Sequence, residues 1–189
     1  MSMPVERAWG DRSASFIGLF VLLAASMMVF AAFSGAFVFR RGLSGDWTSM
    51  PKPPILFLNT AVLLASSFAL EMARRALKAG LRSKFNAWWS AGALLGVLFL
   101  FGQALAWQQL KDLGIYVATS PSSSFFYVLT ASHALHLVGG VAALIYVAAR
   151  SLSPSLAPAR RTVIDISAIF WHFLDGLWVY LMVLFYVWG

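Results

Sequence analysis

The chain has 189 residues, of which 60% are hydrophobic, only 11% are charged and none is cysteine. A soluble domain is about 45–50% apolar and about 25% charged, so this composition excludes an ordinary soluble protein and indicates an integral membrane protein, while the missing thiols exclude disulfides and thiol catalysis. The net charge of +7 comes from basic residues scattered between apolar runs, which is typical of membrane anchoring and not of a nucleic-acid-binding face.

Five apolar stretches follow one another along the chain, each long enough to cross about 30 Å of hydrocarbon as a helix of roughly 20 residues. They cover residues 16–39, 55–72, 88–110, 125–149 and 164–188. Their length and the lack of two-residue alternation predict helices and not the strands of a barrel. We therefore expect an all-α fold, a single membrane domain over residues 1–189 built as a bundle of five transmembrane helices.

Basic residues are divided unevenly between the two ends of these predicted helices. Of the 14 Lys and Arg, four lie at one end, namely Arg40, Arg41, Lys52 and Lys111, and ten lie at the other. Because basic residues concentrate on the cytoplasmic side of a membrane, the pattern predicts a cytoplasmic N-terminus and a C-terminus outside, in the periplasm. Five tryptophans lie near the predicted interfaces, where amphipathic rings prefer to sit: Trp9, Trp47, Trp88, Trp89 and Trp188.

All three histidines and one aspartate fall inside the predicted spans. His133 and His136 are three residues apart in the fourth span, and His172 and Asp175 are three apart in the fifth, so each pair shares a helix face. An acidic group at a helix centre costs about 2.5–3.5 kcal/mol, so such groups face protein and find a partner. One interpretation is a structural cluster in which the two pairs satisfy each other. The other is a cofactor site, since imidazoles and a carboxylate can bind zinc, iron or haem.

Further polar residues in the spans are expected to tie helices together, although they could instead line a path for an ion or substrate. They are Asn59, Thr60, Ser66, Ser67, Gln103, Gln108 and Gln109. Glu71 precedes Arg74 and Arg75 by helical spacing, which predicts ion pairs at the membrane surface; the same arginines could hold an acidic lipid headgroup. Gly92 and Gly96 form a small-xxx-small pair that favours close approach of another helix to the third span.

Sequence signatures of enzymes are missing. The chain has no phosphate-binding glycine loop, no nucleophile elbow and no HExxH motif. It also lacks the paired repeat halves and interrupted spans expected of a transporter. The residues alone therefore indicate a helical membrane subunit whose function lies in association.

A series of segments, taken in chain order, resembles subunit III of the haem–copper terminal oxidases. The segments are Asn59-Thr60, Ser66-Ser67, Gly102-Gln103, Ala106-Trp107-Gln108-Gln109-Leu110, Phe126-Tyr127-Val128-Leu129-Thr130, His133 with His136-Leu137-Val138-Gly139-Gly140, and Trp171-His172-Phe173-Leu174-Asp175 with Trp178. The specific part is the combination of His-xx-His with the later Trp-His-Phe-x-Asp-xx-Trp. The resemblance covers the chain from Phe16 onward and is closest to the short bacterial form, which has five helices and lacks the first two of seven.

The resemblance implies an accessory subunit of a proton-pumping oxygen reductase of the cytochrome c oxidase type, in the bacterial plasma (inner) membrane. Such a subunit binds no redox centre. It lies against subunit I, which holds the haems and copper, and is expected to meet subunit II and to join larger respiratory supercomplexes. In the family it stabilises the catalytic subunit, supports proton uptake from the cytoplasm and offers a phospholipid-filled cleft as an oxygen route.

For individual residues, the resemblance implies structural roles. The intramembrane polar cluster would consist of His133, His136, His172 and Asp175. Contacts to lipid headgroups would come from Arg74, Arg75 and Trp107. One position departs from the family: where members usually carry a buried glutamate in the first helix of this region, this chain has Ser26. A role for an intramembrane carboxylate at that position therefore does not carry over.

Two alternative functions stay open from the sequence. The chain could be the accessory subunit of a nitric-oxide reductase or of a quinol oxidase. It could also be a small haem- or metal-dependent membrane enzyme that uses the histidine set.

Overall fold

The computed structural model describes the backbone of residues 3–43, 45, 47, 51–151 and 158–189, and side chains from residue 12 onward except those of 44, 46, 48–50 and 152–160. This part of the chain contains five α-helices and no strand. They are α1 (Met3–Leu43), α2 (Ile55–Lys78), α3 (Arg82–Asp112), α4 (Pro121–Ser151) and α5 (Pro158–Trp188). Each of the five is long and apolar enough to cross a membrane, which confirms the predicted all-α fold.

The predicted spans lie inside longer helices. The prediction for the second span ended at residue 72, whereas α2 continues to Lys78, and α3 begins at Arg82, six residues before its predicted start at 88. The apolar run marks only the part of a helix that sits in hydrocarbon. Lys and Arg are good helix formers, so the helices continue through the basic segments that flank each run.

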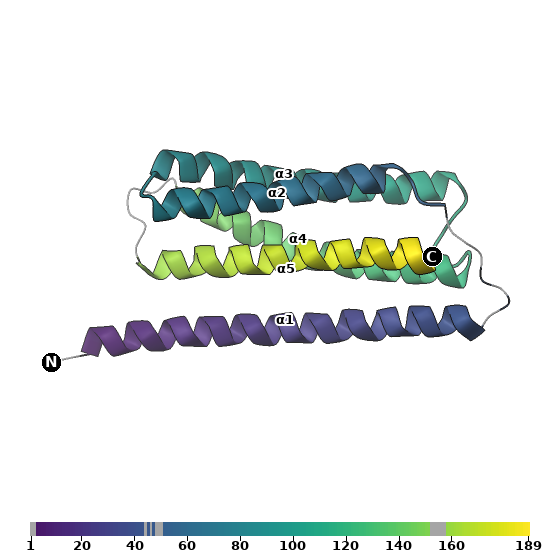
Figure 1. Ribbon diagram of the computed structural model, residues 1–189, viewed down its shortest axis with the longest axis horizontal. Coiled ribbons are helices and arrows are strands. Elements are labelled where there is room, and N and C mark those ends of the chain that lie inside the picture. The colour runs from purple at the N-terminus through teal and green to yellow at the C-terminus, as the bar shows by residue number, and fades with distance from the viewer. Residues whose placement is uncertain (1–2, 44, 46, 48–50, 152–157) are drawn as a thin grey trace.

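The helices form an antiparallel bundle (Figure 1). α2 and α3 lie side by side, α5 contacts α1, α2 and α4, and α4 also contacts α1 and α3. The start of α1, the turn between α2 and α3, the end of α4 and the start of α5 gather at one end, which we call the basic end; the end of α1, the turn between α3 and α4 and the end of α5 lie at the opposite end. Two of the turns use a glycine with positive φ, Gly80 after α2 and Gly114 after α3, a conformation that suits a helix C-terminus.

Close packing along α3 confirms the prediction from the Gly92 and Gly96 pair. A Cβ atom placed on Gly92 would lie 2.7 Å from the Leu70 side chain of α2, and one on Gly96 would lie 2.5 Å from the Trp171 ring of α5. Any larger residue would therefore force the Leu70 side chain or the Trp171 ring to shift. The small residues let α3 pack closely against α2 and leave room for the Trp171 ring of α5.

α1 is the least covered helix. Only 17% of its apolar window is buried inside the protein, against 39% for α3 and 44% for α5. Its buried side chains, which include Leu19, Phe30 and Phe37, form one narrow stripe toward α4 and α5. Most of α1 is thus left to face lipid or another chain.

The tryptophans near the helix ends divide into two groups. Trp88 and Trp188 are exposed on the bundle surface, as amphipathic rings at an interface are expected to be. Trp89 is instead fully buried, and its indole N–H donates to the Leu144 carbonyl at 3.0 Å, so its ring packs inside the bundle and not against lipid. Consecutive residues on a helix point about 100° apart, which turns Trp89 inward. The Trp9 side chain lies outside the described residues.

Candidate functional site

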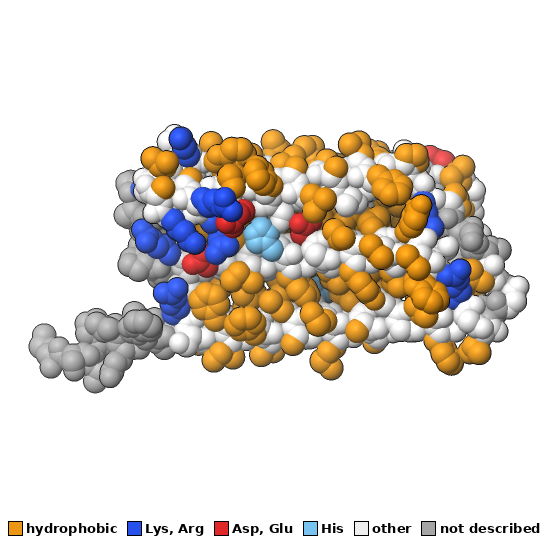
Figure 2. Space-filling view, in the orientation of Figure 1, with side chains coloured by type: hydrophobic (Ala, Val, Ile, Leu, Met, Phe, Trp, Pro, Cys, Tyr) orange, Lys and Arg blue, Asp and Glu red, His pale blue; other side chains and the backbone are white. Residues whose placement is uncertain are grey.

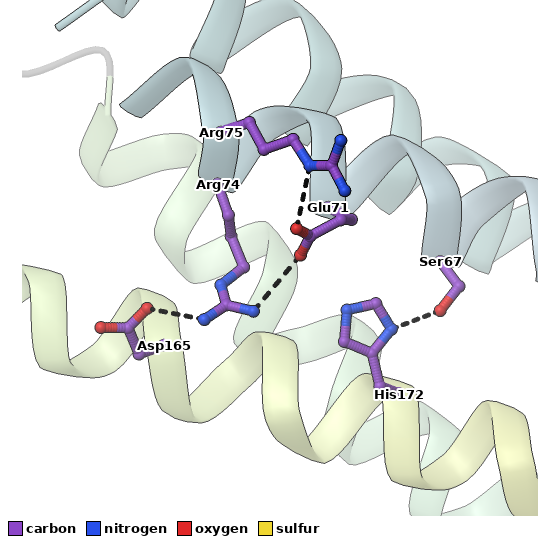
Figure 3. A network of polar contacts seen from close by, with 6 residues as sticks. All are labelled: Ser67, Glu71, Arg74, Arg75, Asp165 and His172. Carbon is purple, nitrogen blue, oxygen red and sulfur yellow. Dashed lines mark hydrogen bonds and ion pairs between the residues drawn. The ribbon is translucent and has the colours of Figure 1, made fainter. Parts of the chain in front are cut away.

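The four side chains expected to form one polar cluster are separated into two groups. His172 lies on the side of α5 that faces α2 (Figure 3), whereas His133 of α4 lies among aromatic rings from α1, α3 and α5. In the part of the chain that the structure describes, no three His, Asp or Glu side chains come close enough together to hold a metal ion. The two pairs therefore find their neighbours on other helices, and not in each other.

A serine of α2 binds a histidine of α5. The Ser67 hydroxyl and His172 Nδ1 are 2.5 Å apart and share a hydrogen bond. Asp175, three residues after His172 on α5, is only 7% exposed, and its Oδ1 has no hydrogen-bond partner within the described residues. The Ser67 bond ties α2 to α5 near the middle of α5.

Toward the basic end, the same seam between α2 and α5 carries ion pairs (Figure 3). Glu71 pairs with Arg74 at 3.4 Å and with Arg75 at 3.2 Å, as the helical spacing predicted. Arg74 also reaches Asp165 of α5, again at 3.4 Å. We did not identify Asp165 from the sequence, although its position two helical turns before His172 on α5 places it on the same face.

Beside these ion pairs lies a basic cavity of about 400 Å³. It is lined by Arg12, Arg74, Leu77, Lys78, Arg161, Thr162 and Asp165, from α1, α2 and α5. Four cations thus surround it with a single carboxylate, and Arg74 Nε is buried without a partner among the described residues. Figure 2 shows the blue side chains gathered at this end of the molecule. Arg75 does not line the cavity; its side chain is 69% exposed.

A half-open apolar groove of about 510 Å³ runs between α1 and α5 farther into the membrane. It is lined by Met27, Phe30, Ala31, His172, Phe173, Gly176, Leu177 and Tyr180. The groove and the basic cavity both lie between α1 and α5 and follow each other along those helices. Together they offer a cationic pocket followed by an apolar channel.

His133 occupies a box of aromatic rings at the centre of the bundle. Its imidazole is fully buried and stacks on Trp178 of α5, with ring centroids 5.1 Å apart and planes at 27°. Phe99 of α3 and Phe30 of α1 present their edges at 6.2 and 6.4 Å. Neither ring nitrogen has a hydrogen-bond partner within the described part of the chain.

Gln103 is another buried polar residue on the side of α3 that faces α4. Trp107 of α3 donates to the Thr130 hydroxyl of α4 at 3.1 Å, and Phe99 meets His133. Gln103 lies one turn from both Phe99 and Trp107, so it faces the same stretch of α4. The residue is 1% exposed, and both amide atoms are unpaired among the described residues. The interface between α3 and α4 thus buries polar atoms of Gln103 and His133 that have no hydrogen-bond partner among the described residues.

The remaining predicted residues act locally or between helices. His136 donates from its ring to the Ser132 carbonyl of its own helix at 2.7 Å, and Ser26 is buried and donates to the Leu22 carbonyl at 2.8 Å. The helix-tying role expected of four residues is confirmed by bonds to α3 or α5: Asn59 to Phe99, Thr60 to Trp178, Ser66 to Gly92, and Ser67 to His172. Gln108 and Gln109 are exposed and tie no helices.

Comparison with known proteins points to one family. The family described as cytochrome c oxidase subunit III matches residues 14–189. The probable cytochrome c oxidase subunit 3 of Nocardia farcinica is 32% identical over 176 residues, covering 90% of this chain and 86% of that protein. The cytochrome c oxidase subunit 3 of Thermostichus vulcanus is 30% identical over 190 residues, covering 98% and 93%. With a match over almost its whole length and this five-helix bundle, the chain belongs to the cytochrome c oxidase subunit III family.

Proposed function

We propose that this chain is the non-catalytic accessory subunit III of a proton-pumping haem–copper oxygen reductase of the cytochrome c oxidase type. The observation that carries the proposal is the family match over residues 14–189. The names of the relatives favour this assignment over a nitric-oxide reductase or a quinol oxidase. In such a complex the haems and copper belong to subunit I, and this chain lies against subunit I and subunit II in aerobic respiration.

The surroundings of the histidines support a role without a redox centre. His172 and His136 each commit a ring nitrogen to a protein partner. His133 keeps both nitrogens unpaired, but the ring is stacked on Trp178 and edged by Phe99, which leaves no room for a porphyrin beside it. The donor set does not fit haem ligation, so a small haem or metal enzyme is the weaker candidate.

We place the basic end in the cytoplasm and the C-terminus outside, in a bacterial plasma membrane. Among the described side chains, this end carries Arg12, Arg74, Arg75, Lys78, Arg82, Lys84, Arg150 and Arg161. The opposite end carries Arg40, Arg41, Lys52 and Lys111. The asymmetry follows the preference of basic residues for the cytoplasmic side, and the ion pairs of Glu71 and Asp165 with Arg74 lie at this same end.

The basic cavity and the apolar groove support binding of a phospholipid by this subunit. A phosphate among four cations gains electrostatic attraction of about 1 kcal/mol for each Lys or Arg near the surface, and the groove between α1 and α5 accepts an acyl chain. Of the predicted headgroup contacts, Arg74 lines the cavity. Arg75 is turned outward, and Trp107 uses its N–H on Thr130 near the other end of the bundle.

Removal of the chain from the assembled oxidase tests the function. We expect the haem spectrum of the complex to stay nearly unchanged, because the redox centres lie in another subunit, while turnover falls or decays sooner. An absorption spectrum and a metal analysis of the isolated chain form the second arm. A Soret band or stoichiometric metal on this chain would contradict the proposal, and co-purification with a nitric-oxide-reducing subunit would favour the alternative complex.

A further inference from the structure

The end of the bundle opposite the basic end holds a separate apolar cavity of about 270 Å³. It is lined by Phe37, Lys52, Leu56, Phe57, Ser122, Phe126, Met182, Val183, Phe185, Tyr186, Val187 and Gly189, so α1, α2, α4 and α5 all contribute. Its floor is built from rings: Phe185 lies 6.0 Å from Phe37 and 4.9 Å from Phe126, centroid to centroid. The two ring pairs are edge-on or tilted, with planes at 79° and 51°, so the cavity has an aromatic lining.

Cations and aromatic rings surround the entrance to this cavity. Lys52 Nζ lies 5.3 Å from the centre of the Tyr186 ring, and Lys52 also lines the cavity. Arg41 lies over Trp188 at 5.5 Å and donates to the Val187 carbonyl at 3.2 Å. No carboxylate side chain is among the residues that line the cavity. The entrance therefore combines positive charge with the amphipathic rings that sit at headgroup level.

From this arrangement we propose a second lipid site, in which an anionic phospholipid places its phosphate at Lys52 and one acyl chain in the cavity. In a bilayer, the medium that fills an apolar recess is lipid. An apolar cavity of about 150 Å³ already accepts benzene, so 270 Å³ admits a stretch of acyl chain. The cation at the rim then selects for an acidic headgroup. This site lies at the opposite end of the bundle from Arg74 and serves the other leaflet.

The test uses the purified membrane complex that contains this chain, in nanodiscs doped with phosphatidylglycerol carrying a photoactivatable diazirine in its acyl chain. After illumination, mass spectrometry of the peptides maps the adducts. We expect adducts on the cavity-lining peptides Met182–Tyr186 and Leu56–Phe57. Lys52→Gln should lower their yield about fivefold, the factor that corresponds to about 1 kcal/mol.

Matched variants separate the site from general exposure to lipid. Val183→Phe and Met182→Phe place a larger side chain in the cavity and should abolish the adducts, and two such variants guard against failure of one to fold. Val179→Phe changes an exposed residue of α5 outside the cavity lining and should leave them unchanged. Lys111→Gln removes another cation of the same end, away from the cavity, and should also have no effect.

Three results would overturn the proposal. One is an adduct yield that does not change in Lys52→Gln or in the filling variants, which would mean non-specific lipid contact. The second is equal labelling by phosphatidylcholine, which would remove the role of the acidic headgroup. The third is preferential labelling by a diazirine fatty acid, which would identify a free carboxylate as the ligand. None of these readouts depends on oxidase activity, so a negative result would reject the lipid site and would not bear on the proposed function.

Discussion

His133 is fully buried and His172 is half-buried in the bundle, and they hold helices together in different ways. His172 forms a hydrogen bond to Ser67 at a partly open seam between α2 and α5. His133 makes no hydrogen bond among the described residues and is held by ring contacts to Trp178, Phe99 and Phe30. His172 contacts its neighbour through a hydrogen bond to a ring nitrogen, whereas His133 contacts its neighbours only through packing of its ring.

The magnitudes indicate which of the two matters more for stability. Interhelical hydrogen bonds in membranes average only about 0.6 kcal/mol, because an unfolded helix in lipid also finds polar partners. Truncation of a fully packed core side chain costs about 2–5 kcal/mol, since it removes contacts and leaves a cavity. We therefore expect the histidine without a hydrogen bond to contribute more.

The largest effect is expected for His133→Ala. The change empties the centre of the aromatic box, where rings from three other helices meet the imidazole, and should lower the free energy of unfolding by about 2–5 kcal/mol. Reversible unfolding in mixed micelles, compared with His172→Ala as the matched variant, measures the difference. Equal losses in the two variants would refute the distinction between packing and hydrogen bonding.

A larger residue on α3 tests separately whether close packing in the interior stabilises the bundle. Gly96→Ala places a methyl group 2.5 Å from the Trp171 ring, next to His172 in the sequence, and should destabilise the bundle by about 1–3 kcal/mol. Gly139→Ala is the control, because a Cβ there meets nothing within 4 Å. If both variants unfold alike, the packing of the Trp171 ring against Gly96 is not a source of stability.

A third variant concerns a buried polar group that the packing leaves unpaired. Both amide atoms of Gln103 are buried without a partner among the described residues, and such atoms cost about 1–3 kcal/mol. Gln103→Leu removes them and keeps a side chain of similar size, so it should raise the free energy of unfolding by up to about that amount, measured in the same micelles. A loss of stability in Gln103→Leu would show that the amide makes a stabilising bond in the folded protein.

The smallest effect is expected at the hydrogen-bonded histidine. Ser67→Ala removes the hydrogen bond from α2 to His172 of α5 and should cost about 0.6 kcal/mol. In the presence of His172→Ala the same change should cost less, because the bond is already lost. A loss as large as that of His133→Ala would show that the Ser67 bond, and not ring packing, dominates the interior.

The five helices and the contacts within single helices could be predicted from the local sequence pattern. Apolar runs of sufficient length predicted all five helices, because a span in hydrocarbon must satisfy its backbone internally. Glu71 with Arg74 and Arg75, and Gly92 with Gly96, were predicted correctly because both patterns depend only on spacing along one helix. The expectation that the three histidines contact protein groups was also met, since ionisable groups avoid lipid.

The partners across helices were decided only by the tertiary structure. The sequence placed His172 with the α4 histidines, whereas the structure joins it to Ser67, brings Asp165 to Arg74 and buries Trp89. In a soluble protein, the apolar stripe of a helix shows which face turns inward. In a membrane, lipid is as apolar as the core, so hydrophobicity no longer marks that face, and the rotation and register of each helix are determined by the packing of all five.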